Sequence, residues 1–191
     1  PYISHTGAII TQGNHVWTGT GDGVYRMNMS DGSVRHYTQE DGLASQQVYS
    51  IVIDRSGALW FGTDNGISGF DGSSWKTYTV ADGLSSNRII AGALDTDGSL
   101  WFLTDNGASH FKGGSWTNYT YLDGLGMNPI ALAVGPDGTK WFGCNNMVSS
   151  FNGTDWKTYI LFESGDDEPW IRQMACDAEG RVWVGFLGPM G

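Results

Sequence analysis

The residues best suited to binding chemistry fall at one recurring position of the chain. A tryptophan recurs at positions 17, 60, 101, 141 and 183, and the residue thirteen places before each of them changes in charge and size. Arg88 and Trp170 are the most informative members, because a cation and an aromatic face suit anionic or sugar ligands. The complete set at this position is Ser4, Gln47, Arg88, Asn128 and Trp170.

Polar pairs follow three of the tryptophans at a fixed distance. Asp64-Asn65, Asp105-Asn106 and Asn145-Asn146 each begin four residues after a tryptophan, inside a turn. We expect the loops between repeats to share one face with these turns, and varied side chains on a constant scaffold can build specificity. For any single residue, the alternative interpretation is an unconstrained loop position. The predicted ligand-binding residues are Gln47, Asp64, Asn65, Arg88, Asp105, Asn106, Asn128 and Trp170.

Motifs for catalysis or metal binding are not found in the sequence. The four histidines lack zinc-site spacing, and no Ser/His/Asp or Cys/His set can be identified from residue order. Residues 95–98, Asp-Thr-Asp-Gly, resemble part of a calcium loop, but we favour aspartates that cap their own turn. Cys144 and Cys176 are interpreted as small buried residues, although a disulfide between them stays open. We therefore expect no metal, no cofactor and no catalytic role.

The elements that position these residues recur together with the tryptophans. The steps between successive tryptophans are 43, 41, 40 and 42 residues. In the second repeat, short segments at 48–53, 58–63, 67–70 and 75–80 are separated by turn signals such as Asn-Gly and Asp-Gly. Four strands in about 40 residues, repeated, are typical of a β-propeller blade. No stretch has a convincing helical period, so we predict an all-β fold without a long helix.

The number of repeats predicts an incomplete ring. We expect a single β-propeller segment over residues 1–191, made of about four and a half four-stranded antiparallel blades. Closed propellers contain about 4–8 whole blades, and a half blade leaves an open sheet edge. The sequence therefore predicts part of a larger propeller, or one whose remaining strands come from another chain. The repeats span 4–43, 44–84, 85–125, 126–167 and, in part, 168–191.

The composition argues against two classes of partner. The chain has a formal net charge of −10 with only 10 lysines and arginines, whereas nucleic-acid binding depends on clustered cations. No apolar run reaches about 18 residues, so we expect no insertion into a membrane. The acidic surface is interpreted as a solvated one, with cationic ligands as the alternative.

The second repeat carries the most specific pattern. Over residues 51–67 it is Ile-x-x-Asp-x-x-Gly-x-Leu-Trp-Phe-Gly-Thr-x-x-Gly-Ile, and Phe-Asp-Gly-x-x-Trp-x-x-Tyr-Thr-x-x-Asp-Gly-Leu follows over 70–84. This pattern resembles the two-component regulator propeller repeat, and the third repeat copies its first half over 94–107. The resemblance covers nearly the whole chain. It weakens in the fourth repeat, where Gly135 replaces the turn aspartate and Met147 replaces the turn glycine.

The resemblance implies a setting for the protein. Such repeats form propellers, often of about seven blades, in the extracytoplasmic part of bacterial hybrid sensor kinases and in secreted or surface proteins. The sensor versions recognise ligands such as glycan fragments and act as dimers. It implies a periplasmic or extracellular, sensor-like module that binds a small molecule, a glycan fragment or a protein partner.

Two other functions stay open at this point. One is a structural or assembly protein that associates with itself through the open blade edge, so that chains complete each other's blades. The other is a lyase or hydrolase on a propeller scaffold, because the fold is also similar to that of streptogramin-type lyases. No residue-by-residue match to a catalytic motif supports the enzyme. The identity of the ligand stays open in every case.

Overall fold

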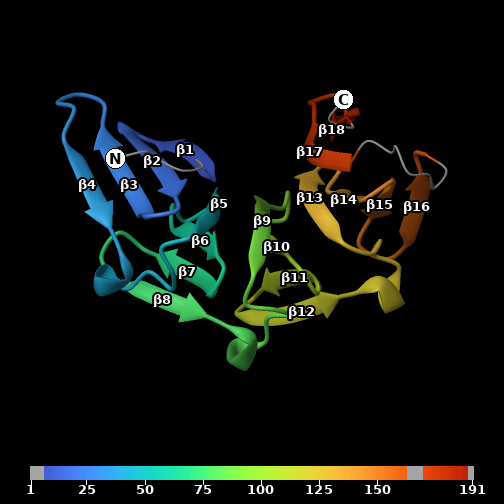
Figure 1. Ribbon diagram of the computed structural model, residues 1–191, viewed down its shortest axis with the longest axis horizontal. Helices are drawn as coiled ribbons and strands as arrows, with labels where there is room; N and C mark the ends of the chain where they lie inside the picture. The colour runs from blue at the N-terminus through green and yellow to red at the C-terminus, as the bar shows by residue number, and fades with distance from the viewer. Residues whose placement is uncertain (1–6, 163–169, 189–191) are drawn as a thin grey trace. The chain divides into compact units, whose positions relative to one another are not determined.

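The fold is built almost entirely from antiparallel strands (Figure 1). The computed structural model describes residues 7–162 and 170–188, which form eighteen β-strands and three 3-10 turns. The strands make four four-stranded sheets and one two-stranded sheet. No helix in these two ranges is long and apolar enough to cross a membrane. The predicted all-β class, with four blades and a partial fifth, is confirmed.

Each sheet corresponds to one predicted repeat, and its strands lie in sequence order across the sheet. The first sheet contains β1 (Ala8–Gln12), β2 (His15–Thr20), β3 (Gly23–Asn28) and β4 (Val34–Tyr37). The second contains β5 (Val48–Ile53), β6 (Leu59–Thr63), β7 (Gly66–Phe70) and β8 (Trp75–Tyr78). The third contains β9 (Ile89–Leu94), β10 (Leu100–Thr104), β11 (Gly107–Lys112) and β12 (Ser115–Tyr119). The fourth contains β13 (Pro129–Val134), β14 (Lys140–Cys144), β15 (Met147–Phe151) and β16 (Trp156–Ile160), and the fifth contains β17 (Trp170–Cys176) and β18 (Val182–Leu187). The 3-10 turns η1 (Gln39–Asp41), η2 (Val80–Asp82) and η3 (Tyr121–Asp123) follow the first three sheets.

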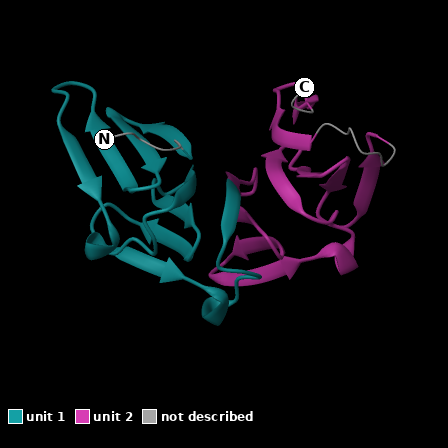
Figure 2. Cartoon of the chain, in the orientation of Figure 1, with its two compact units in different colours: residues 1–92 teal, residues 93–191 magenta. Residues whose placement is uncertain are grey.

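The chain divides into two compact units (Figure 2). Residues 1–92 form the first unit, which contains the first two sheets, and residues 93–191 form the second. The second unit contains β10–β12 with the fourth and fifth sheets, and the division falls inside β9. That residues 1–191 make a single propeller segment stays a prediction.

A buried threonine closes the turn between the second and third strands of a blade. The Thr63 hydroxyl donates to the carbonyl of Gly66 at 2.7 Å and accepts from the N–H of Asn65 at 3.1 Å. Gly66 has a φ of 109°, which a side chain rarely adopts. The threonine of the Trp-Phe-Gly-Thr pattern is therefore a structural turn residue. The same pair of bonds is made by Thr20 and Thr104.

The fourth strand of the second sheet ends earlier than the sequence predicts. Predicted over 75–80, β8 stops at Tyr78, because Thr79 caps η2 instead of continuing the strand. The Thr79 hydroxyl accepts from the N–H of Ala81, and the Asp82 carboxylate accepts from the N–H of Thr79, so the turn is capped reciprocally. The β-branched Val80, which favoured a strand, is an exposed member of this turn. The same capping box recurs at Thr38 and Thr120.

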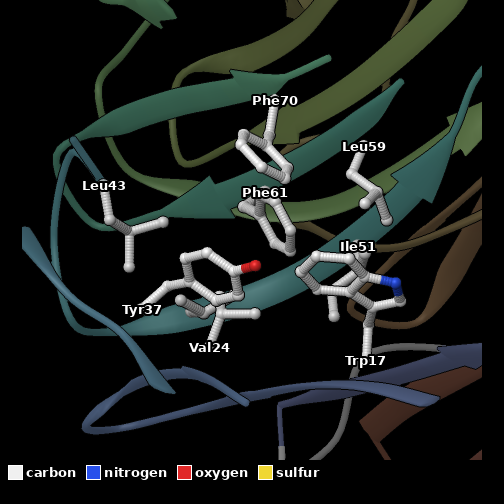
Figure 3. Close-up of a cluster of buried hydrophobic side chains, with 9 residues drawn as sticks. Trp17, Val24, Tyr37, Leu43, Ile51, Leu59, Phe61 and Phe70 are labelled. Atoms are coloured by element: carbon white, nitrogen blue, oxygen red, sulfur yellow. The ribbon is translucent and has the colours of Figure 1, made fainter. Parts of the chain in front are cut away.

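Aromatic rings from adjacent sheets interdigitate in the first unit (Figure 3). Trp17 of β2 stacks on Tyr37 of β4 with ring centroids 5.6 Å apart, and it meets Phe61 of the second sheet at 6.0 Å. Phe70, also from the second sheet, lies 5.7 Å from Tyr37. Truncating such a buried ring typically costs about 3–5 kcal/mol. The prediction that the recurring tryptophan fills the gap between adjacent sheets is confirmed for Trp17 and Trp101, whereas Trp183 of the fifth sheet is 61% exposed.

The glycine after a capping turn packs against the following blade. Gly124 has a φ of 114°, and a β-carbon on it would lie 2.7 Å from the β-carbon of Trp156 in β16. Gly42 would meet Trp75 of β8 at the same 2.7 Å. Only glycine fits, because the backbone conformation and the close contact both exclude a side chain. The Asp-Gly-Leu motif thus joins one blade to the next within each unit.

We expect Gly124→Ala to destabilise the fold more than Gly153→Ala. The two glycines have similar φ values of 114° and 106°, so both substitutions carry a backbone cost of about 1–2 kcal/mol. A β-carbon at Gly153 has nothing within 4 Å, whereas one at Gly124 collides with Trp156. Urea unfolding should therefore show an extra loss of about 1–3 kcal/mol for Gly124→Ala. Equal losses in the two variants would contradict this contact between blades.

Candidate functional site

The loops between blades and the turns between second and third strands lie at the same end of a blade. In the second blade, the N–H of Gly66 in the turn donates to the carbonyl of Asn87 in the loop at 2.7 Å. In the first blade, the side-chain amide of Gln47 donates to the carbonyl of Gly21 at 3.0 Å. In the fourth blade, the side-chain amide of Asn146 donates to the carbonyl of Phe162 at 3.0 Å. Each unit therefore presents loop and turn residues together, as the sequence predicts.

The predicted ligand-binding residues lie in these loops and turns, and they divide between the two units. Arg88 directly precedes β9 and is exposed, while Trp170 begins β17 with 68% of its surface exposed. Gln47 already has a structural contact, so its side chain also serves the scaffold. The binding role of the whole set stays a prediction. The first unit holds Gln47, Asp64, Asn65 and Arg88, and the second holds Asp105, Asn106, Asn128 and Trp170. Ser4 and the loop residues 163–169 lie outside the described residues.

An open groove of about 500 Å³ lies at the loop end of the fourth sheet, within the second unit. Ligand pockets commonly have volumes of about 300–1,000 Å³, so this groove has room for a small ligand or a short segment of chain. It contains one predicted site residue, Asn128. Its lining residues are Tyr121, Gly124, Leu125, Gly126, Met127, Asn128, Asn145, Met147 and Thr158.

Two departures from the repeat shape this groove. The β14–β15 turn has Met147 where the other turns have a glycine of positive φ, and the left-handed conformation moves to Asn145 with a φ of 46°. The loop before β13 has three residues after Leu125 instead of four after the equivalent leucines, and Asn128 adopts a φ of 51°. Within the described residues, Asn128 and Asn145 are the non-glycine residues with positive φ. Such conformations cost energy and concentrate at functional sites.

The groove combines apolar and amide surfaces without a formal charge. Tyr121 and Met127 are 63% and 64% exposed, and Leu125 is buried beneath them. Sequence reasoning placed Asn128, Asn145 and the loop that contains Met127 on this face, but it named neither Met127 nor Tyr121 as a binding residue. The sequence signal for Tyr121 was a local one, namely an aromatic residue at the first position of η3, where η1 has Gln39.

A second cluster of polar residues lies at the turn between β9 and β10. One oxygen of the Asp95 carboxylate accepts both from the indole N–H of Trp101 at 3.1 Å and from the Lys140 ammonium at 3.0 Å. The Lys140 side chain is only 8% exposed, and its nitrogen lies 5.3 Å from the Trp101 ring centroid. The Asp95 side chain is thus occupied by structural contacts inside the fold. No group of residues that could hold a metal ion is found among the described residues.

Nearby hydroxyl and imidazole groups do not form a nucleophilic triad. His110 Nε2 lies 2.8 Å from Ser99 Oγ, but that hydroxyl donates its proton to Asp97 at 2.6 Å. A triad needs the histidine between serine and carboxylate, so that it can accept the serine proton. Burial lowers the pKa of His110, which keeps the ring neutral at pH 7. Burial also raises the pKa of Cys144 to about 12, so its thiol is not a nucleophile at neutral pH.

Comparison with protein families identifies the second repeat. Residues 42–65 match the family described as "Two component regulator propeller", and this segment contains the Leu-Trp-Phe-Gly-Thr pattern. The resemblance predicted from the sequence is confirmed. Comparison with curated proteins yields no match.

Solved structures show the fold of the whole chain. The extracellular domain of a hybrid two-component system from B. thetaiotaomicron aligns with a TM-score of 0.82 and 20% identity, covering 97% of this chain and 28% of that one. A second such domain from the same organism gives a TM-score of 0.80 and 22% identity, over 95% and 27% of the two chains. A catalytically inactive virginiamycin B lyase from Staphylococcus aureus with quinupristin gives 0.71 and 18%, over 92% and 61%. The fold is that of a β-propeller, and this chain spans less than a third of the two B. thetaiotaomicron domains.

We expect the Asp95–Lys140 pair to show strong coupling. Asp95→Ala should cost about 3–5 kcal/mol, because it leaves a buried ammonium without a counter-charge. The double variant Asp95→Ala/Lys140→Leu should be more stable than Asp95→Ala, since no unpaired charge stays buried. Leucine is a suitable replacement because Leu59 and Leu100 hold the equivalent position. Urea unfolding of both single variants and the double measures the coupling, and purely additive losses would show that the pair is energetically independent.

Proposed function

From the two-component regulator propeller repeat in this chain, we propose that the protein is a recognition module. In this proposal it is a non-catalytic, sensor-like, extracytoplasmic propeller segment that binds a small ligand or a protein partner. The observation that carries the proposal is a contrast inside each blade. The core repeats from blade to blade, while the chemistry at the loop end changes.

The core side of this contrast recurs in the second, third and fifth sheets with the same residue types and geometry. The indole N–H of the recurring tryptophan donates to a turn aspartate at 2.9 Å for Trp60, 3.1 Å for Trp101 and 3.0 Å for Trp183. At the loop end, the position thirteen residues before the tryptophan holds an amide, a guanidinium and an indole in turn. A rigid scaffold with variable loops is the arrangement that proteins commonly use for recognition.

The structural likenesses support the extracytoplasmic part of the proposal. Both B. thetaiotaomicron domains are extracellular parts of hybrid two-component systems, and each aligns with at least 95% of this chain. The lyase aligns with 92% of this chain but shares only the fold. The serine, histidine and cysteine groups described above are engaged or protonated, so the enzyme function has no specific support among the described residues.

We expect a ligand of this module to depend on Arg88 or Trp170. Thermal-shift screening of the chain against glycan fragments and small anions should give hits whose stabilisation is lost in Arg88→Ala or in Trp170→Ala. A ligand present at a hundred times its Kd should stabilise the fold by about 2.7 kcal/mol. Arg55→Ala, an exposed arginine in the β5–β6 turn, serves as the control. A hit that survives both substitutions would place the site elsewhere, and no hit in any ligand class would contradict recognition itself.

Association through the fifth sheet is a second candidate function. Trp183 of β18 is 61% exposed, whereas the equivalent Trp17 and Trp101 are 3% and 1% exposed in their sheets. An exposed indole beside exposed Phe186 and Leu187 favours a protein contact. Light scattering should then show concentration-dependent association that Trp183→Ser weakens. A monomer at all concentrations would rule out self-association of this chain.

A further inference from the structure

We propose that the groove at the loop end of the fourth sheet binds an extended, uncharged segment of peptide with apolar side chains. This inference rests on the recognition function proposed above and names a site and a partner chemistry for it. The proposed site lies in the second unit alone, because every lining residue belongs to residues 93–191.

The absence of charged lining residues favours an uncharged ligand. None of its nine lining residues carries a formal charge, in a chain whose net charge is −10. Asp123 borders the groove in sequence, but its carboxylate accepts from the N–H of Thr120 at 2.8 Å and from its hydroxyl at 3.1 Å. A charged group entering the groove would lose water without gaining an opposite charge, which is unfavourable.

The two asparagines supply groups that match a peptide backbone. A carboxamide offers two donors and one acceptor oxygen, and a peptide unit offers one donor and one acceptor. Neither the Asn128 nor the Asn145 side chain is hydrogen-bonded to another of the described residues, unlike Asn146, whose amide donates to the carbonyl of Phe162 at 3.0 Å. Both residues line the groove and have left-handed backbone conformations.

The apolar part of the groove favours a side chain over a sugar ring. Met127 and Met147 lie on the groove above buried Leu125, and unbranched thioethers adapt to side chains of different shapes. Sugar hydroxyls need several acceptors, but the lining has no carboxylate. Tyr121 is its single aromatic residue.

The outer strand of the fourth sheet offers a backbone partner beside the groove. Thr158, a lining residue, belongs to β16, which ends the strand order β13-β14-β15-β16. Residues 157–160 of this strand are all exposed. An extended peptide can add to such an edge through main-chain hydrogen bonds, while a neighbouring pocket holds one of its side chains. The groove and β16 together provide these two components.

Nuclear magnetic resonance of the isotope-labelled 191-residue chain tests the inference directly. The probe is the acetylated and amidated heptapeptide Ser-Leu-Ser-Met-Ser-Leu-Ser, compared with the same peptide carrying Asp or Lys at its centre. We expect the uncharged peptide to shift the amide signals of residues 126–128, 145–147 and 156–160, and both charged peptides to bind more weakly. Asn145→Gly keeps the left-handed backbone but removes the amide, and should weaken binding about five- to tenfold.

A matched pair of variants separates the groove from general effects. Tyr121→Ser changes the first residue of η3 inside the groove, and Val80→Ser changes the first residue of η2 outside it. Only Tyr121→Ser should weaken peptide binding, and equal effects would overturn the inference. Groove signals that move with maltoheptaose but not with the peptide would also overturn it, while leaving the recognition function intact. If neither probe moves the groove signals and ligands bind through Arg88 or Trp170, the groove is not the site. If no ligand binds anywhere, the proposed function fails as well.

Discussion

The structure depends on burying an indole between sheets without leaving its N–H unsatisfied. A buried donor without an acceptor costs about 1–3 kcal/mol, which would cancel much of the free energy gained by burying the ring. The turn aspartate answers this constraint: Asp54 accepts from the Trp60 indole at 2.9 Å and from the N–H of Ser56 at 2.8 Å, so one carboxylate fixes both the ring and its turn. The first blade lacks this aspartate, and Trp17 Nε1 has no hydrogen-bond partner among the described residues.

The fourth blade departs from this arrangement. Gly135 replaces the turn aspartate there, and Lys140 replaces the leucine that precedes the recurring tryptophan. The Lys140 ammonium reaches Asp95 of the preceding turn at 3.0 Å, so one carboxylate serves a buried cation and the Trp101 indole together. Burying an ion pair adds little stability by itself, but it is specific in geometry, and it links two turns that the repeat otherwise leaves separate.

The sequence predicted the repeated part of the molecule well and the altered part less well. The strand predicted at 48–53 is β5 to the residue, because the repeat, the turn signals and the aromatic spacing all indicate one period. The strand predicted to Val80 ends at Tyr78, since a capping threonine outweighs the β propensity of one valine. Asn128 could be placed at the loop end from its spacing alone. The groove that Tyr121 and Met127 line could not be predicted, because it arises from a shortened loop and a relocated left-handed residue, neither of which has a repeat counterpart.

The altered fourth blade is where a propeller of this kind can carry a site at little risk to its fold. Its two left-handed asparagines are strained, yet the loop that leads to Asn128 is held by two contacts. On one side, Gly124 lies against Trp156. On the other, the Ser149 hydroxyl accepts from the N–H of Gly126 at 2.9 Å. The strain is therefore held by blade packing that the other repeats also use, while Met147 and Asn145 are free to differ from them. The regularity of the core is what permits an irregular, chemically distinct groove at one point of the loop face.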